Sequence, residues 1–206
     1  SNNPYRDKGQ RFAEIGLKNL EESLDTLVME DGSFSQHSVN YHRLVLDTLC
    51  QLELWRRWLR LKSFSHDFKR KFKLLTNWLS KFVDIKTGFT PNLGHNDGAY
   101  CYKLHDLNYC DFRPTLRLSN ILSKSINKWK LNSGPWDEPL YWLGIKNIKE
   151  VKEENKKSDL FKNGGYLIFQ PNKVNWGFIR LPIYNFRPAH ADPLHFDLWT
   201  FGVNLL

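Results

Sequence analysis

A thirteen-residue stretch from Arg187 to Trp199 holds two histidines, two aspartates and an arginine. From Leu194 onward its residues alternate between two faces, which is typical of a β-strand. Imidazole and carboxylate groups this close together can transfer protons and orient one another, whereas a structural strand requires none of them. The stretch therefore indicates the wall of a functional site, with a merely solvated strand face as the alternative. The apolar face would carry Leu194, Phe196 and Leu198, and the polar face His195, Asp197 and Trp199.

A second polar stretch, residues 31–43, reads DGSFSQHSVNYHR. His37 and Tyr41 are four residues apart and would share one helical face, as would Gln36 and Asn40. The beginning of a helix at this point would also favour an anion. The alternative is structural: a serine caps the helix and Tyr41 belongs to the core.

The third stretch, residues 91–98, reads PNLGHNDG and lies in a long region rich in Gly, Asn, Asp and Pro. Long loops in compact domains are often functional, and Gly94 and Gly98 would permit close backbone approach. Asn96 and the nearby Tyr100 are the candidates, with Tyr102 as a competing tyrosine. A plain turn with an aromatic anchor fits the same residues.

Together, and in this order, the three stretches resemble motifs of the heparinase II/III-like polysaccharide lyases, over residues 31 to 199. The resemblance implies an α/α toroid followed by an antiparallel β-sandwich domain. It also implies β-elimination on polysaccharides that contain uronic acid. The catalytic residues it implies are His37, Tyr100 and His190, and the substrate-binding residues are Gln36, Asn40, Tyr41, His42, Asn96, Arg187 and His195.

Two positions depart from the pattern of this family. Gln36 stands where asparagine is common, and it keeps the amide donor on a longer side chain. Pro188 replaces the first histidine of an H-x-H-A-D run. Some members bind structural zinc through the histidine that corresponds to His190. Structural zinc takes four ligands, so that role would need residues beyond Leu206, and we expect no metal site and no cofactor.

The composition limits the classes of function. The chain has 206 residues, of which 41% are hydrophobic, enough for a core. A net charge of +8 favours polyanions such as acidic polysaccharide or nucleic acid, unless it only marks a solvated lysine-rich surface. No helix-turn-helix, zinc spacing or RNP-like motif supports nucleic acid, and no apolar run is long enough for a membrane span. Three cysteines, an odd number, argue against a disulfide framework.

Hydrophobic periodicity predicts helices first and strands later. Helices are expected at residues 8–29, 38–61 and from Ser65 to Phe82, then from Pro114 through Ile126 and Trp129, with a short helix at 139–143 and a loop at 84–112. Strands are expected at 166–169, 176–181, 194–199 and 203–206. The buried stripe of the second helix would be Tyr41, Val45, Thr48, Leu49, Leu52, Trp55 and Leu59.

This order predicts an α+β multidomain chain. An antiparallel helical, toroid-like domain would occupy residues 1–145, a charged linker 146–160, and the first strands of a β-sandwich domain 161–206. Four short strands cannot close a sandwich, so we expect part of a longer protein. The compartment stays open, although the family resemblance implies the bacterial periplasm or secretion.

Three functions follow as hypotheses. The first is a lyase, or a lyase fragment, that acts on acidic polysaccharide. The second is a non-catalytic acidic-glycan-binding protein or an inactive lyase fragment, which Pro188 and Gln36 favour. The third, a basic nucleic-acid binder, lacks a supporting motif.

Overall fold

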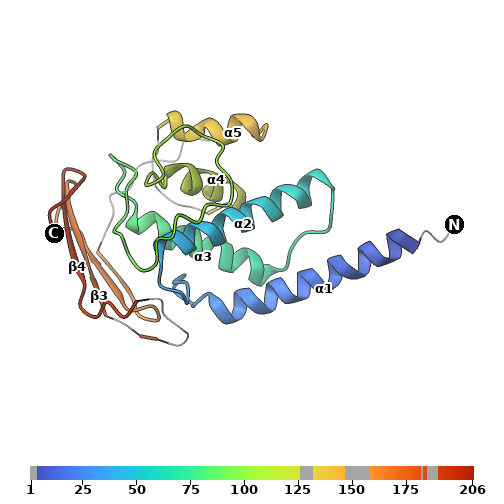
Figure 1. The fold of residues 1–206 in the computed structure, drawn as a ribbon, viewed down its shortest axis with the longest axis horizontal. Helices are drawn as coiled ribbons and strands as arrows, with labels where there is room; N and C mark the ends of the chain where they lie inside the picture. The colour runs from blue at the N-terminus through green and yellow to red at the C-terminus, as the bar shows by residue number, and fades with distance from the viewer. Residues whose placement is uncertain (1–3, 126–131, 147–157, 182, 185–189) are drawn as a thin grey trace.

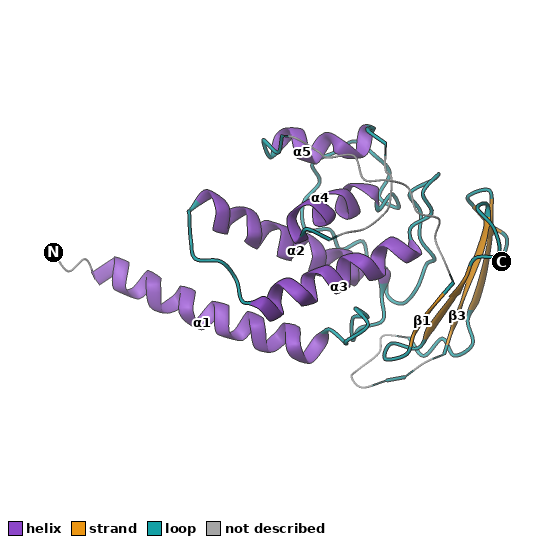
Figure 2. Cartoon of the chain, turned by 180° about the vertical axis from the view of Figure 1, so that it is seen from behind, coloured by secondary structure: helices purple, strands orange, loops and turns teal. Residues whose placement is uncertain are grey.

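The computed structural model describes residues 4–125, 132–146, 158–181, 183–184 and 190–206. Helices fill the first part of the chain and a sheet stands at one end of them, with the N-terminal helix extending away to the opposite side (Figures 1 and 2). The helices are α1 (Pro4–Leu27), α2 (Val39–Trp58), α3 (His66–Phe82), α4 (Arg113–Ser123), the 3₁₀ turn η1 (Pro135–Asp137) and α5 (Glu138–Trp142). The strands are β1 (Asp159–Phe161), β2 (Tyr166–Phe169), β3 (Asn175–Arg180), β4 (Phe196–Thr200) and β5 (Val203–Asn204).

The five strands form one antiparallel sheet in which each strand pairs with the next in sequence. Helices followed by an antiparallel sheet confirm the predicted α+β fold class. Strand β1 was not predicted, and it begins at Asp159, inside the stretch expected to be a linker. Within the described residues, no helix combines the length and apolarity that crossing a bilayer would require.

Side chains at the helix ends explain where the helices begin. The Ser65 hydroxyl accepts a hydrogen bond from the backbone N–H of Phe68, 3.1 Å away, and so caps α3 as predicted. Pro114 lies in the first turn of α4, where its missing N–H costs nothing. Helix α4 ends at Ser123, before Lys124 adopts a left-handed conformation. The predicted continuation through Ile126 and Trp129 falls outside the described residues.

The buried face of α2 differs from the predicted stripe. Trp55 and Leu59 are 50% and 67% exposed, so the prediction was wrong for the C-terminal half of the helix. Leu49 is buried as predicted. The difference has a physical reason: the inward face of the N-terminal half is largely polar, so a search for apolar spacing selects the wrong residues. The buried residues of α2 include the polar side chains of Asn40, His42, Arg43 and Asp47.

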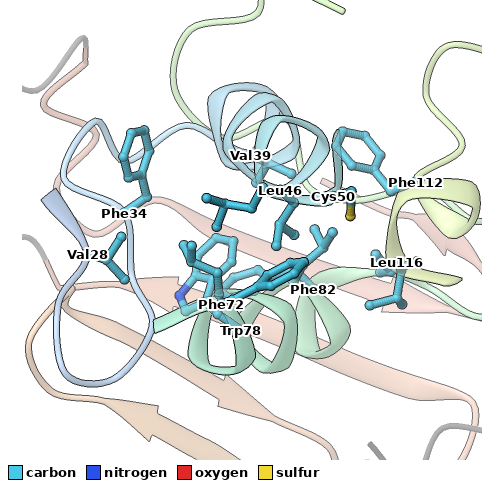
Figure 3. Close-up of a cluster of buried hydrophobic side chains, with 14 of the residues drawn as sticks. Val28, Phe34, Val39, Leu46, Cys50, Phe72, Trp78, Phe82, Phe112 and Leu116 are labelled. Atoms are coloured by element: carbon cyan, nitrogen blue, oxygen red, sulfur yellow. The ribbon is translucent and has the colours of Figure 1, made fainter. Parts of the chain in front are cut away.

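The helices and the sheet share one hydrophobic core (Figure 3). Phe82, at the end of α3, stacks on Trp78 with ring centroids 4.0 Å apart. The same ring meets Tyr166 of β2 at 5.6 Å and Phe178 of β3 at 5.7 Å, both edge-on. Such edge-to-face pairs are favourable beyond the area that they bury. The end of α3 therefore holds the sheet against the helices.

The predicted alternation of β4 is present, and its polar face is the face turned inward. Asp197 and Trp199 are buried, whereas Leu194, before the strand, is exposed. Trp199 stacks on Trp176 of β3 at 5.1 Å, and the Trp176 indole N–H donates to a carboxylate oxygen of Asp84, 3.3 Å away. The polar face of the strand thus lies towards the helical part of the chain.

We predict that Phe82→Ala destabilises the whole molecule by about 3–5 kcal/mol, because it opens a cavity where helices and sheet meet. Denaturant unfolding, followed by far-ultraviolet circular dichroism and by tryptophan fluorescence, measures this loss. The matched control is Trp58→Ala, which removes an exposed ring of α2 and should cost about 1 kcal/mol or less. Equal losses in the two variants would contradict a shared core.

Candidate functional site

The N-terminus of α2 is the structural base of the site. The Ser38 hydroxyl caps the helix by accepting from the backbone N–H of Tyr41, at 3.1 Å. The same hydroxyl donates to the backbone oxygen of His95 at 2.6 Å, and the Val39 N–H donates to the Leu93 oxygen at 3.1 Å. The loop of residues 91–98 therefore docks directly on the beginning of this helix.

This docking requires glycine at position 94. Gly94 has a φ of +70°, in the left-handed region. A Cβ added there would lie 2.4 Å from the backbone oxygen of His37, closer than real Cβ contacts come. The predicted role of Gly94, close backbone approach, is present in the structure.

Asp97 fastens the same loop to α2 from the outside. One carboxylate oxygen accepts from the Tyr41 hydroxyl at 2.6 Å, and the other from the Asn40 amide at 3.3 Å. The hydrogen bond from Tyr41 lowers the pKa of Asp97 and raises the pKa of Tyr41. Tyr41 therefore positions the loop.

Arg43 holds the far end of the loop through its buried guanidinium. Nη2 donates to the Asn40 side-chain oxygen at 2.8 Å and Nη1 to the Tyr109 backbone oxygen at 2.6 Å. The guanidinium carbon also lies 4.2–4.4 Å from the ring centroids of Tyr100, Tyr109 and Phe112. We call Arg43 and these three rings the Arg43 cage. Cation–π contacts strengthen when water is excluded, so the cage fixes the three aromatic residues relative to α2.

Asp47, one turn beyond Arg43 on α2, is also buried. Its carboxyl accepts from the Thr115 hydroxyl at 2.8 Å. Burial raises the pKa of Asp47 to about 7, although the Thr115 hydrogen bond and the Arg43 charge act in the opposite direction. The Asp47 carboxyl is therefore held in place by its hydrogen bond from Thr115, with the Arg43 charge nearby.

Tyr109 presents its hydroxyl beside the loop amides. The hydroxyl oxygen lies 2.5 Å from the Asn40 side-chain oxygen and 2.9 Å from that of Asn96, and it donates its single hydrogen to one of them. A cavity of about 250 Å³ opens at this point, and we take it as the candidate site because amide and phenol groups converge on it. Its lining is Val39, Asn40, Thr90, Pro91, Asn92, Leu93, Asn96, Tyr109, Cys110 and Phe112.

His190 brings the region before β4 to this loop. The His190 ring meets the His95 ring edge-on, with centroids 4.9 Å apart. The Nδ1 atom of His190 lies 3.8 Å from a carboxylate oxygen of Asp192, and both side chains keep solvent contact. The 187–199 stretch thus contacts the 91–98 loop, which itself docks on the 31–43 stretch, while Arg187 lies outside the described residues.

His37 occupies the turn before α2 but is only 3% exposed. Its φ of +52° places a non-glycine residue in the left-handed region, which costs about 1 kcal/mol or more. Burial, followed by the nearby Arg180 charge, lowers the pKa of His37 to about 4. The imidazole is therefore neutral at physiological pH and lies below the surface, while the neighbouring Gln36 is exposed.

Three other predicted residues lie away from the cavity. His42 is buried between α2 and α3, stacked on Trp78 at 4.3 Å with Nε2 2.9 Å from the Leu75 oxygen. We therefore propose His42 as a core residue. Tyr100 has its hydroxyl 2.6 Å from Nε2 of His105, and burial raises its pKa to about 12. His195 lies on the sheet, where its Nε2 is 3.1 Å from Asp197.

Sequence reasoning missed Tyr109. Three tyrosines fall between residues 100 and 109, and no spacing rule shows which of them returns to α2. The available signal was Arg43, one turn after Asn40: an arginine on a buried helical face requires ring faces and acceptors around it. No group of three or more metal-binding side chains is assembled within the described residues.

Comparison with known proteins identifies the fold. No protein-family model matches the chain, and no curated protein is detectably similar to it in sequence. A crystal structure of heparinase III superposes with a TM-score of 0.67 over 95% of this chain, at 14% identity. Heparan sulfate lyase HepC from Pedobacter heparinus gives a TM-score of 0.65 over 95%, at 17% identity.

The chain has the fold of part of heparinase III. This confirms, for the fold, the resemblance that the three motifs indicated. The chain spans 30% of the length of heparinase III and 28% of that of HepC. The identities are too low to carry over an activity, so what the site does is a separate question.

We predict that Arg43→Lys destabilises the protein by about 3 kcal/mol, because lysine cannot make two hydrogen bonds and three ring contacts from one planar group. Amide hydrogen exchange should accelerate at residues 91–112 before it does so in α3. The matched control is Arg70→Lys, at a partly exposed ion pair with Glu30, which should change stability by about 1 kcal/mol or less. Unchanged exchange in the loop would contradict the role given to the cage.

Proposed function

We propose that this chain belongs to a polysaccharide lyase that cleaves uronic-acid-containing acidic polysaccharide by β-elimination. The observation that carries the proposal is that the 31–43 and 91–98 stretches line one cavity and that His190 of the 187–199 stretch contacts His95 of the same loop, in a chain with the fold of part of heparinase III. A net charge of +8 suits a polyanionic substrate. The names of the structural neighbours, heparinase III and heparan sulfate lyase, make heparan sulfate the first polymer to test.

The reaction requires three kinds of group. The proton on C5 of a uronate is a weak acid, so donors must neutralise the adjacent carboxylate as negative charge develops, each worth about 3–4 kcal/mol. A base then removes the proton and an acid protonates the oxygen that leaves C4. Each transfer contributes roughly 10²–10⁴ in rate.

Residues that line the cavity, and exposed residues of the same polar stretches, can supply these groups. The amides of Gln36 and Asn96 are suitable donors to a carboxylate. His190, exposed beside His95, can accept a proton. Burial raises the pKa of Tyr109, so its phenol stays protonated at neutral pH and can give a proton to the leaving oxygen. Arg187 stays a proposed partner for the sugar carboxylate.

A second function, non-catalytic binding of acidic glycans, is favoured by one observation. Two of the three catalytic candidates are already engaged: His37 is buried against Tyr166, and the Tyr100 hydroxyl is bonded to His105. A protein that only binds needs neither group at its surface. The amides, the basic charge and the cavity would then serve affinity alone.

We predict that the purified chain, incubated with heparan sulfate and a panel of other uronate polymers, produces the ultraviolet absorbance of an unsaturated uronate. Tyr109→Phe and His190→Ala should each lower the rate by roughly 10²–10⁴, because each removes one proton transfer. The control is Tyr141→Phe on α5, which alters an exposed tyrosine and should leave the rate unchanged.

Binding to the same polymers separates the two functions. If the folded chain binds heparan sulfate but produces no rise in absorbance, the result would contradict the lyase and support the glycan-binding protein. If duplex DNA abolishes the binding of heparan sulfate, the result would favour a nucleic-acid binder instead.

A further inference from the structure

A buried hydrogen-bonded series joins the sheet to the turn before α2. Arg180 of β3 donates from Nη1 to the Tyr166 hydroxyl oxygen at 3.0 Å. That hydroxyl lies 2.7 Å from Nδ1 of His37. All three side chains are buried, and Arg180 is fully enclosed. The three residues come from β3, β2 and the 31–43 stretch, so the series forms only when the sheet is docked.

The direction of the hydrogen bonds in this series is determined by Arg180. A guanidinium has no acceptor, so it must donate to the Tyr166 oxygen. The hydroxyl hydrogen of Tyr166 then needs an acceptor of its own, because a buried hydroxyl left unsatisfied is costly. Nδ1 of His37 is the acceptor that the structure provides. The remaining hydrogen of a neutral His37 ring is therefore on Nε2.

The charges around His37 agree with a neutral ring. From the sheet, Arg180 disfavours a positive imidazole, and burial disfavours it more strongly. Asp31, from the turn after α1, acts in the opposite direction, as does the backbone oxygen of Ile183. Two aromatic rings complete the surroundings, Tyr166 at 5.9 Å and Tyr184 edge-on at 5.7 Å. Asp31 is therefore the acidic group that faces the ring.

Nε2 of His37 is the free end of the series. It is buried and makes no regular hydrogen bond within the described residues, although the ring approaches the Ile183 backbone oxygen. Nε and Nη2 of Arg180 likewise have no acceptor among the described residues. The series thus leaves unused N–H donors at both of its ends.

We propose that Arg180 and Tyr166 are positioning residues that hold His37 in its Nε2–H form, so that His37 acts as a hydrogen-bond donor and not as a base. The proposal goes beyond the proposed function, because the Nε2–H form follows from the Arg180–Tyr166–His37 series alone. The ring approaches the backbone oxygen of Ile183, which is available to accept the Nε2 hydrogen. Proton abstraction at C5 then falls to another residue.

Nitrogen-detected NMR of the ¹⁵N-histidine-labelled full chain tests this directly. The seven histidines are resolved through backbone assignment, and His37→Gln confirms the His37 signals. We expect the nitrogen pattern of an Nε2–H ring that stays unchanged from neutral pH down to about pH 5. An Nδ1–H ring, or titration of His37 near its ordinary pKa in the folded protein, would overturn the proposal.

Variants then test whether Arg180 is responsible. Arg180→Met should let the His37 ring populate both neutral forms and raise its pKa, since the directing donor and the repelling charge are both lost. Arg180→Lys keeps a donor and a charge and should restore the Nε2–H form at least in part. Tyr166→Phe should remove the preference while leaving Arg180 in place.

His42 provides an internal control in every spectrum. It is a second buried neutral histidine with Nε2 on a backbone oxygen, that of Leu75, and it does not contact Arg180. Its signals should stay constant in all three variants, which separates a local effect from general loosening. A His37 pattern identical to wild type in Arg180→Met would overturn the role of Arg180. The NMR result does not depend on turnover, so failure of the lyase assay and failure of this proposal are distinguishable.

Discussion

The buried guanidinium of Arg43 is the interaction on which the candidate site depends. A charge removed from water requires acceptors and polarisable surfaces on all sides. Arg43 has acceptors in the Asn40 side chain and the Tyr109 backbone and lies against three ring faces, while its Nε has no hydrogen-bond partner among the described residues. The 84–112 region contains no helix or strand of its own until it nears α4, so side-chain contacts such as those of Arg43, Ser38 and Asp84 hold its path.

The same segment that supports the loop also docks the sheet. Asp31, the first residue of the 31–43 stretch, accepts backbone hydrogen bonds from Asn163 at 2.7 Å and Gly164 at 3.0 Å, between β1 and β2. His37 contacts Tyr166 of β2 a few residues later. Several polar side chains of this stretch are thus engaged in contacts that hold the loop and the sheet, whereas Gln36 is exposed.

Local signals in the sequence predicted the local structure. Three of these signals depend only on residues close in sequence, and each is found where it was expected. They are the serine that caps α3, the proline at the start of α4 and the alternation in β4. The face of α2 and the identity of the inner tyrosine depend on contacts across dozens of residues. Apolar spacing could not reveal a buried polar face, and three closely spaced tyrosines could not reveal which one meets Asn40. Strand β1 follows a charged run and is only three residues long. Three residues are too few to show the alternating pattern of a strand.

The most direct test of the account is an NMR titration of the folded chain with a short uronate-containing oligosaccharide of defined length. The account predicts that the largest amide shifts fall together at Asn96 and Tyr109, which line the candidate cavity, and at Gln36 and His190, which belong to the stretches that form it or contact its loop. A second cavity, of about 870 Å³, lies between α1 and α2 and is lined chiefly by apolar side chains such as Leu20 and Trp55. Shifts confined to that groove, or spread evenly over the basic surface, would contradict the account.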